Sequence, residues 1–294
     1  MDQNLKETKK TNDKMPIYKF GRGILGFIYK LWYRPTIIGK ENIPKEGSLL
    51  IVGNHINIMD QCNVIIATKR CIHYMAKKEY FDPKYKEGKF PWFFRGTGCI
   101  PVDRSKKDDE AMHAALEVLE KGEVLGLFPE GTRNGLKEER AKEIYEEYVD
   151  KNISFEEFYK KAKKNKTTHI NYLEELMNDK TISRDEFIDN LTTADDLLQD
   201  LILNGRITKE DYYEHSFLPL KFGAVSMAKK TDAYIVPFSV TGDYKFRSKN
   251  LVYRIGKPFK VTKMELPDAN KRLEKAIGDL MKKSLSEEKK WKKF

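Results

Sequence analysis

Two hydrophobic patterns alternate along most of the chain. Short apolar runs predict strands, and they cover Ser48–Gly53, Ile72–Ala76, Cys99–Val102, Val124–Phe128, Tyr234–Val240 and Leu251–Ile255. Stretches with apolar residues three and four positions apart predict helices, at about 59–68, 108–121, 218–230 and 267–290. Because strands that alternate with helices form mainly parallel sheets, we expect an α/β fold with a mixed, mostly parallel sheet flanked by helices.

The segment 136–216 interrupts this alternation with helical patterns alone. Ser154, Ser183 and Thr208 each precede an acidic residue three positions later, which is the capping-box signature of a helix start. The segment carries 13 basic and 20 acidic residues, a net charge of −7, so the rest of the chain carries +17. We therefore expect an all-helical insertion at 136–216 within a domain formed by 35–135 and 217–294.

Residues 1–34 are predicted to be a polar tail followed by an amphipathic helix. Six residues share one apolar face of this helix: Ile17, Phe20, Ile24, Phe27, Ile28 and Leu31. Lys19, Arg22 and Lys30 lie on the other side. Such a helix either packs its apolar face on its own domain or lies at a membrane surface, where basic residues attract anionic headgroups. No segment reaches the roughly 20 apolar residues of a spanning helix.

The overall charge of +10 indicates an anionic partner, either nucleic acid or a lipid surface. The amphipathic helix and the absence of a recognised nucleic-acid module favour a lipid surface as the partner and argue against nucleic acid. The three cysteines, Cys62, Cys71 and Cys99, form no CxxC cluster, which is typical of a reducing compartment and predicts no metal site. Without a secretory signal, we expect a peripheral protein on the cytoplasmic face of the cell membrane.

Candidate chemistry begins directly after the strand that ends at Gly53. His55 is followed five residues later by Asp60. If the turn between them is not helical, the carboxylate can hold one imidazole nitrogen and leave the other to accept a substrate proton. The alternative is a helix-capping Asp beside a structural His.

Two more strands end in polar residues. Arg104 follows one of them, and Glu130, Gly131, Thr132 and Arg133 follow another. Two arginines at the ends of two strands can converge on one phosphate, because the guanidinium fork matches phosphate oxygens. The alternative for the second group is a salt bridge within the loop. A further strand contains Pro237, which by itself predicts an edge strand or a bulge.

The ordered motifs NHINIMD, GCIPVDR, FPEGTRN and IVPFSV together resemble the four motifs of the glycerolipid acyltransferase family, and the chain looks like its bacterial 1-acyl-sn-glycerol-3-phosphate acyltransferases. The resemblance implies a general base at His55 oriented by Asp60. It implies contacts to the acceptor phosphate at Arg104, Glu130, Gly131, Thr132 and Arg133, and a structural or acyl-site role near Pro237. Asn54, Lys77 and Lys78 are weaker candidates. In typical members a Lys and a small-residue helix closely follow FPEGTR, whereas here the matching segment 221–224 comes after the insertion.

The resemblance further implies transfer of an acyl group from acyl-carrier protein or acyl-CoA to the sn-2 hydroxyl of lysophosphatidic acid, without a cofactor and without an acyl-enzyme. Expected partners are an anionic membrane surface, the thioester donor and a lysophospholipid acceptor. An unidentified partner could bind the insertion. Two alternatives remain: an acyltransferase for another acceptor, such as a lysophospholipid, glycerol 3-phosphate or an amino-acid lipid, and a non-catalytic membrane adaptor.

Overall fold

The computed structural model describes residues 15–86, 88–103, 105–106, 108–131, 146–148, 154, 156–158, 160, 168–190, 194–215, 219–242, 244–247 and 250–287. The chain divides into two compact units. One unit combines Met1–Gly131 with Lys221–Phe294, and the other is Thr132–Leu220. The second unit extends four residues beyond each end of the predicted insertion.

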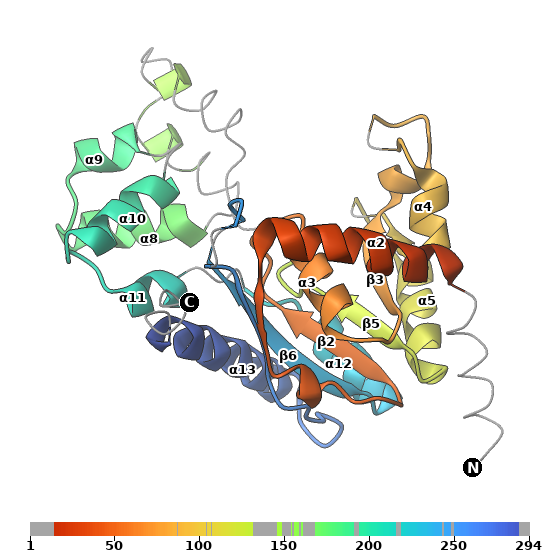
Figure 1. Ribbon diagram of the computed structural model, residues 1–294. Coiled ribbons are helices and arrows are strands. Elements are labelled where there is room, and N and C mark those ends of the chain that lie inside the picture. The colour runs from red at the N-terminus through yellow and green to blue at the C-terminus, as the bar shows by residue number, and fades with distance from the viewer. Residues whose placement is uncertain are drawn as a thin grey trace. The chain divides into compact units, whose positions relative to one another are not determined.

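A seven-stranded sheet forms the centre of the first unit (Figure 1). In chain order its strands are β1 (Thr36–Ile38), β2 (Leu49–Gly53), β3 (Ile72–Lys77), β4 (Ile100–Val102), β5 (Val124–Leu127), β6 (Tyr234–Thr241) and β7 (Val252–Ile255). They are arranged β1-β7-β6-β2-β5-β3-β4, and all neighbours are parallel except β6 and β7. The predicted mixed, mostly parallel sheet is therefore confirmed, and β1 is an additional strand.

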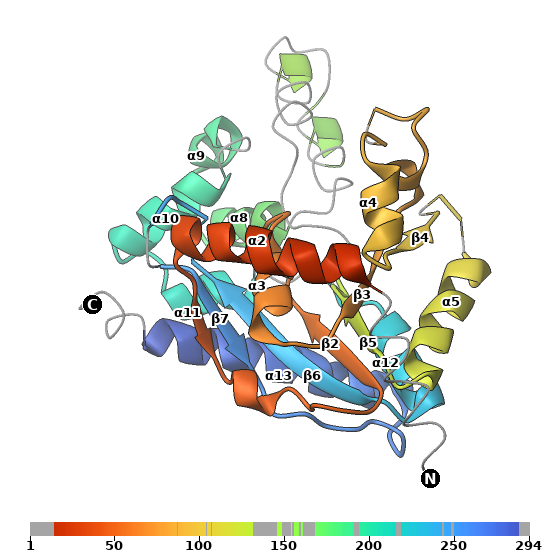
Figure 2. The same ribbon diagram turned by 45° about the vertical axis from the view of Figure 1, so that its right-hand side comes forward.

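Helices cover both faces of this sheet (Figures 1 and 2). The helices α2 (Pro16–Tyr33) and α3 (Asp60–Ala67) lie together on one face. The opposite face is covered by α5 (Asp109–Glu120), α12 (Gly223–Thr231) and α13 (Leu266–Ser286). A short helix, α4 (Pro91–Gly96), lies beside α2. The described residues of this unit also form two single-turn helices, η1 (Lys40–Asn42) and η2 (Lys78–Phe81).

The central strand β2 is buried along its whole length, and its four apolar side chains are fully enclosed by the helices on both faces. Gly53 ends this strand against the ring of Phe238 in β6, where a Cβ would come within 2.4 Å of the ring. Any larger residue would therefore push β2 and β6 apart. This close approach fixes the point at which the chain leaves the sheet and turns towards His55.

Pro237 lies inside the sheet, because β6 has β2 on one side and β7 on the other. The expectation of an edge strand is therefore wrong. The pairing register explains how a proline is accommodated: Phe238 pairs with Ile255, but Ile235 pairs with Phe259, so one extra residue lies on the partner side. This is a β-bulge, which was the other reading of the sequence.

The helix α2 packs on the sheet through the face opposite to its apolar one. Tyr18, Gly26 and Tyr29 are buried, and a Cβ on Gly26 would lie 3.0 Å from Ile66 of α3. The predicted apolar residues Phe20, Ile24, Phe27, Ile28 and Leu31 are instead 48–69% exposed. The helix therefore packs on its own domain, but not through its apolar face. Ile17 is the exception, since it lies against Gly96 of α4.

No helix within the described part of the chain is long and apolar enough to cross a membrane.

The second unit has its own core, formed by α8 (Thr168–Asn178), α9 (Arg184–Asp189), α10 (Ala194–Leu203) and α11 (Lys209–Glu214). Its predicted caps are present. Ser183 and Glu186 form a complete capping box, and Thr208 and Asp211 exchange the same pair of hydrogen bonds. Ser154 accepts from the backbone of Glu157 at 3.2 Å. These caps satisfy N–H groups that the first helical turn leaves without partners.

Candidate active site

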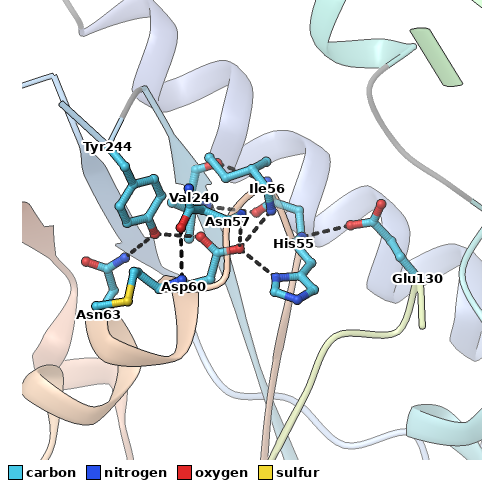
Figure 3. A network of polar contacts seen from close by, with 10 residues as sticks. His55, Ile56, Asn57, Asp60, Asn63, Glu130, Val240 and Tyr244 are labelled. Atoms are coloured by element: carbon cyan, nitrogen blue, oxygen red, sulfur yellow. Dashed lines mark hydrogen bonds and ion pairs between the residues drawn. The ribbon is translucent and has the colours of Figure 1, made fainter. Parts of the chain in front are cut away.

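The polar candidates gather where the parallel strands end. The chain leaves β2 at Gly53, β5 at Leu127 and β6 at Thr241, and these three strands are neighbours that run in one direction. Their carboxyl ends therefore lie at the same edge of the sheet. The loops that follow contribute His55, Glu130 and Tyr244 to one connected group of hydrogen bonds (Figure 3).

His55 and Asp60 form a hydrogen-bonded pair. His55 Nδ1 lies 2.7 Å from Asp60 Oδ2, and the turn between them is not helical, because α3 begins only at Asp60. The imidazole is 18% exposed, whereas the carboxylate is fully buried. Nδ1 must donate to a carboxylate, so Nε2 is the unprotonated nitrogen of the neutral ring. Among the residues that the structure describes, Nε2 has no hydrogen-bond partner.

The Asp60 carboxylate accepts four hydrogen bonds (Figure 3). Besides His55, the backbone N–H groups of Ile56 and Asn57 donate to Oδ2 at 2.7 and 2.8 Å. The hydroxyl of Tyr244 donates to Oδ1 at 2.5 Å. All four partners are donors, so the carboxylate is ionised. A buried charge is tolerated only when it is paired and hydrogen-bonded in this way.

An aromatic stack holds the plane of the His55 ring. The ring of Phe128 lies parallel to it, with 4.0 Å between the centroids and 18° between the planes. Phe128 in turn stacks on Tyr74 and meets Phe238 edge-on. The apolar wall on one side of the imidazole limits ring rotation, so the ring keeps the orientation that its bond to Asp60 sets. Neither Phe128 nor Tyr244 was a site candidate in the sequence.

Glu130 supports the backbone of the same loop. It is 4% exposed, and its Oε1 accepts from the N–H of His55 at 2.9 Å. The resemblance assigned Glu130 to the acceptor phosphate. In the structure one of its carboxylate oxygens instead accepts from the backbone N–H of His55. This bond joins the turn after β5 to the turn after β2.

Gly131 ends the described part of the FPEGT turn with a φ of +73°, a conformation that favours glycine. Lys221 returns to the same turn after the insertion: its N–H donates to the carbonyl of Pro129 at 2.9 Å. Its ammonium lies over Gly131, so close that a Cβ there would be 2.4 Å from Nζ. The structure thus places a cation at the loop where the sequence predicts phosphate contacts.

Of the remaining charged candidates, the structure describes Lys77 and Lys78. Lys78 Nζ pairs with Asp103 Oδ2 at 2.6 Å, and this bond raises the pKa of Lys78 and lowers that of Asp103. Lys77 ends β3 beside it. The arginines and the threonine that the sequence assigned to the phosphate, Arg104, Arg133 and Thr132, lie outside the described residues.

Two weaker candidates have structural partners. The side-chain amide of Asn54 both donates to and accepts from the backbone of Val240, at 2.9 and 2.8 Å, and so extends the pairing of β2 with β6. Pro237 lies in β6 opposite the bulge, whose extra residue is on the partner side. Asn54 thus joins β2 to β6 directly before the histidine loop.

Nucleophilic and metal chemistry find little support in the described residues. No group of three or more His, Cys, Asp or Glu side chains in that part of the chain could hold a metal ion. Burial raises the pKa of the Cys62 thiol to about 11, with the charge of Asp60 as a second cause. At neutral pH this thiol is therefore almost entirely protonated and a poor nucleophile.

Comparison with known proteins assigns the chain to a family. A family model described as Acyltransferase matches residues 34–241, which is more than half of the chain. The protein therefore belongs to the acyltransferase family.

Named relatives include bacterial 1-acyl-sn-glycerol-3-phosphate acyltransferases. The protein of that name from Bacillus subtilis is 31% identical over 118 residues, a match that spans 40% of this chain and 57% of that protein. The one from Streptococcus pneumoniae is 30% identical over 138 residues, spanning 43% and 48%. The crystal structure of the 1-acyl-sn-glycerophosphate (LPA) acyltransferase from Thermotoga maritima has the same fold, with a TM-score of 0.50, 16% identity, and coverage of 96% of this chain and 83% of that one.

The bond from His55 to Glu130 can be tested through stability. In Glu130→Ala the part-buried N–H of His55 loses its acceptor, so the free energy of unfolding should fall by about 1–3 kcal/mol. Glu130→Gln retains an oxygen that can accept, and it should remain within about 1 kcal/mol of the wild type. Urea denaturation measures both. Equal stability of the two variants would show that Glu130 does not hold the loop.

Proposed function

We propose that this protein transfers a fatty acyl group from a thioester, acyl-carrier protein or acyl-CoA, to the sn-2 hydroxyl of lysophosphatidic acid. The product is phosphatidic acid, an intermediate of phospholipid biosynthesis. The observation that carries the proposal is the His55–Asp60 pair, whose Nε2 is an available base at the carboxyl edge of the sheet. The names of the relatives support the choice of acceptor.

In the proposed reaction, Nε2 of His55 takes the proton from the sn-2 hydroxyl as that oxygen attacks the thioester carbonyl. The ionised Asp60 stabilises the imidazolium that forms. The carbon–sulfur bond then breaks, and the imidazolium returns the proton to the departing thiolate. An ester and a free thiol result, and His55 is neutral again.

Lys221 is the cation proposed to bind the acceptor phosphate. Lys221 lies over the turn after β5, and the resemblance implies further phosphate contacts at Arg104 and Arg133. Lys78 is a poorer candidate because Asp103 already neutralises it. Positioning by such cations must complement the base, since general-base catalysis alone contributes about 10²- to 10⁴-fold.

No covalent acyl-enzyme is part of the proposal. The direct route needs only a base, and the thiol nearest in sequence, Cys62, is kept protonated by burial. A cofactor is not required by this chemistry either.

The proposal predicts that His55→Ala lowers kcat by about 10²- to 10⁴-fold, because the hydroxyl loses its base. The matched control is His113→Ala, which removes an imidazole that is 76% exposed on α5 and should retain wild-type activity. Transfer of radiolabelled acyl groups is measured with both donors and with lysophosphatidic acid, lysophosphatidylcholine and glycerol 3-phosphate as acceptors. Full activity of folded His55→Ala would rule out the mechanism, and a preference for another acceptor would correct the substrate.

We also propose that the exposed face of α2 binds an anionic membrane surface peripherally. Five large apolar side chains lie uncovered on it, and Trp32 continues the face onto Phe246, whose ring centroid is 4.8 Å away. Lys19 and Lys30 are exposed on its flank. Apolar bulk beside basic residues is what binding at the interface of an anionic bilayer requires.

This surface can be tested with lipid vesicles. Replacing Phe27 and Leu31 by Glu should reduce binding to phosphatidylglycerol vesicles at least tenfold, because burying each side chain is worth about 1.5–3 kcal/mol. Leu203→Glu is the control, since Leu203 is 80% exposed but belongs to the helical unit. Sedimentation with vesicles measures binding, which should weaken in high salt and on pure phosphatidylcholine. Undiminished binding of the double variant would exclude this face.

A further inference from the structure

The two oxygens of the Asp60 carboxylate have separate roles. Oδ2 accepts from His55 and from two backbone N–H groups, whereas Oδ1 accepts from Tyr244 at 2.5 Å. Tyr244 follows β6 and is 184 residues away from Asp60 in sequence. The hydroxyl thus holds the oxygen that faces away from the histidine (Figure 3).

Two further hydrogen bonds fix the direction of the Tyr244 O–H. The amide nitrogen of Asn63 donates to the Tyr244 oxygen at 2.8 Å, so the single hydroxyl proton remains for Asp60. The oxygen of the same amide accepts from the hydroxyl of Tyr29 at 2.9 Å, which determines how the amide is oriented. From Tyr29 through Asn63 and Tyr244, every donor points towards the Asp60 carboxylate.

Burial protects the hydrogen-bond series Tyr29–Asn63–Tyr244–Asp60 from competition by water. Asp60 and Asn63 are fully buried, and Tyr29 is 4% exposed. Burial, with the Asp60 charge as the second cause, raises the pKa of Tyr244 well above its usual value. The hydroxyl therefore keeps its proton and stays a donor throughout the neutral range.

We propose that Tyr244 is a positioning residue of the His55–Asp60 pair, and that Asn63 and Tyr29 set the direction of its hydroxyl. A carboxylate held at one oxygen alone can rotate about its bond to Cβ. Tyr244 prevents this rotation and keeps Oδ2 facing His55. Because Tyr29 belongs to α2, the helix that presents the exposed apolar face also supports the catalytic base.

For its kinetic consequences this inference rests on the proposed acyl transfer. Tyr244→Phe should lower kcat about tenfold, as expected for one hydrogen bond to a buried charge. KM should change little, because the hydroxyl faces Asp60. The acid limb of the pH–rate profile should move to higher pH, since a carboxylate with one donor fewer stabilises the imidazolium more strongly. Tyr29→Phe should lower kcat and move the acid limb in the same directions, but by less.

Tyr253→Phe is the matched control. Tyr253 is fully buried in β7, and within the described residues its hydroxyl has no hydrogen-bond partner. Tyr253→Phe removes a hydroxyl from the same core but leaves the hydrogen bonds of Tyr29, Asn63 and Tyr244 in place. We expect wild-type kcat, KM and pH profile. Thermal unfolding of the full-length variants shows whether each is folded before kinetics are compared.

A second readout does not depend on activity. The proton between His55 Nδ1 and Asp60 Oδ2 should give a far-downfield proton NMR resonance, assigned by its absence in His55→Ala. It should shift in Tyr244→Phe and remain in place in Tyr253→Phe. If the wild type transfers no acyl group, the proposed function fails, yet this resonance still decides the role of Tyr244.

Three results would overturn the inference. One is a folded Tyr244→Phe with an unmoved resonance. Another is a loss of kcat without any change in the acid limb, which would mean a merely structural role. The third is an equal effect of Tyr253→Phe, which would mean that any missing hydroxyl in this core has the same consequence.

Discussion

The buried carboxylate of Asp60 is the constraint on which the site depends. An ionised group without access to water is stable only if donors surround it. Here they come from the loop between β2 and α3, which holds His55, and from the loop after β6. Satisfying one charge therefore brings together two segments that are 184 residues apart in sequence. The sheet makes this possible, because its parallel strands β2, β5 and β6 end side by side.

The same hydrogen bonds connect Asp60 to α2, a helix at the surface of the molecule. α2 packs through Tyr18, Gly26 and Tyr29, which leaves its apolar side exposed, and Tyr29 bonds towards Asp60 through Asn63. One helix thus combines a face suited to lipid with support for the base. For an enzyme whose proposed acceptor is a membrane lipid, α2 would combine the proposed support of His55 with the proposed membrane contact.

Much of the fold was predictable from sequence, because strand and helix patterns are local. The spacing of His55 and Asp60 allowed their bond, but left a helix-capping Asp beside a structural His as the alternative. Tyr244 was not predictable, since its partner is 184 residues away and only the order of the strands unites them. For α2 the pattern defined two faces but not which one packs inward. The face that packs contains Gly26, where a Cβ would lie 3.0 Å from Ile66 of α3. β1, with three residues, is too short to produce a pattern.

The most direct test of the account is Asp60→Asn, examined for both stability and acyl transfer. A carboxamide has one acceptor oxygen, so it cannot serve four donors; we predict a loss of about 1–3 kcal/mol in the free energy of unfolding. In the same variant, transfer to lysophosphatidic acid should fall by about 10²-fold or more, because His55 is no longer oriented by a charge. An Asn variant with wild-type stability and wild-type transfer would contradict the central role of Asp60.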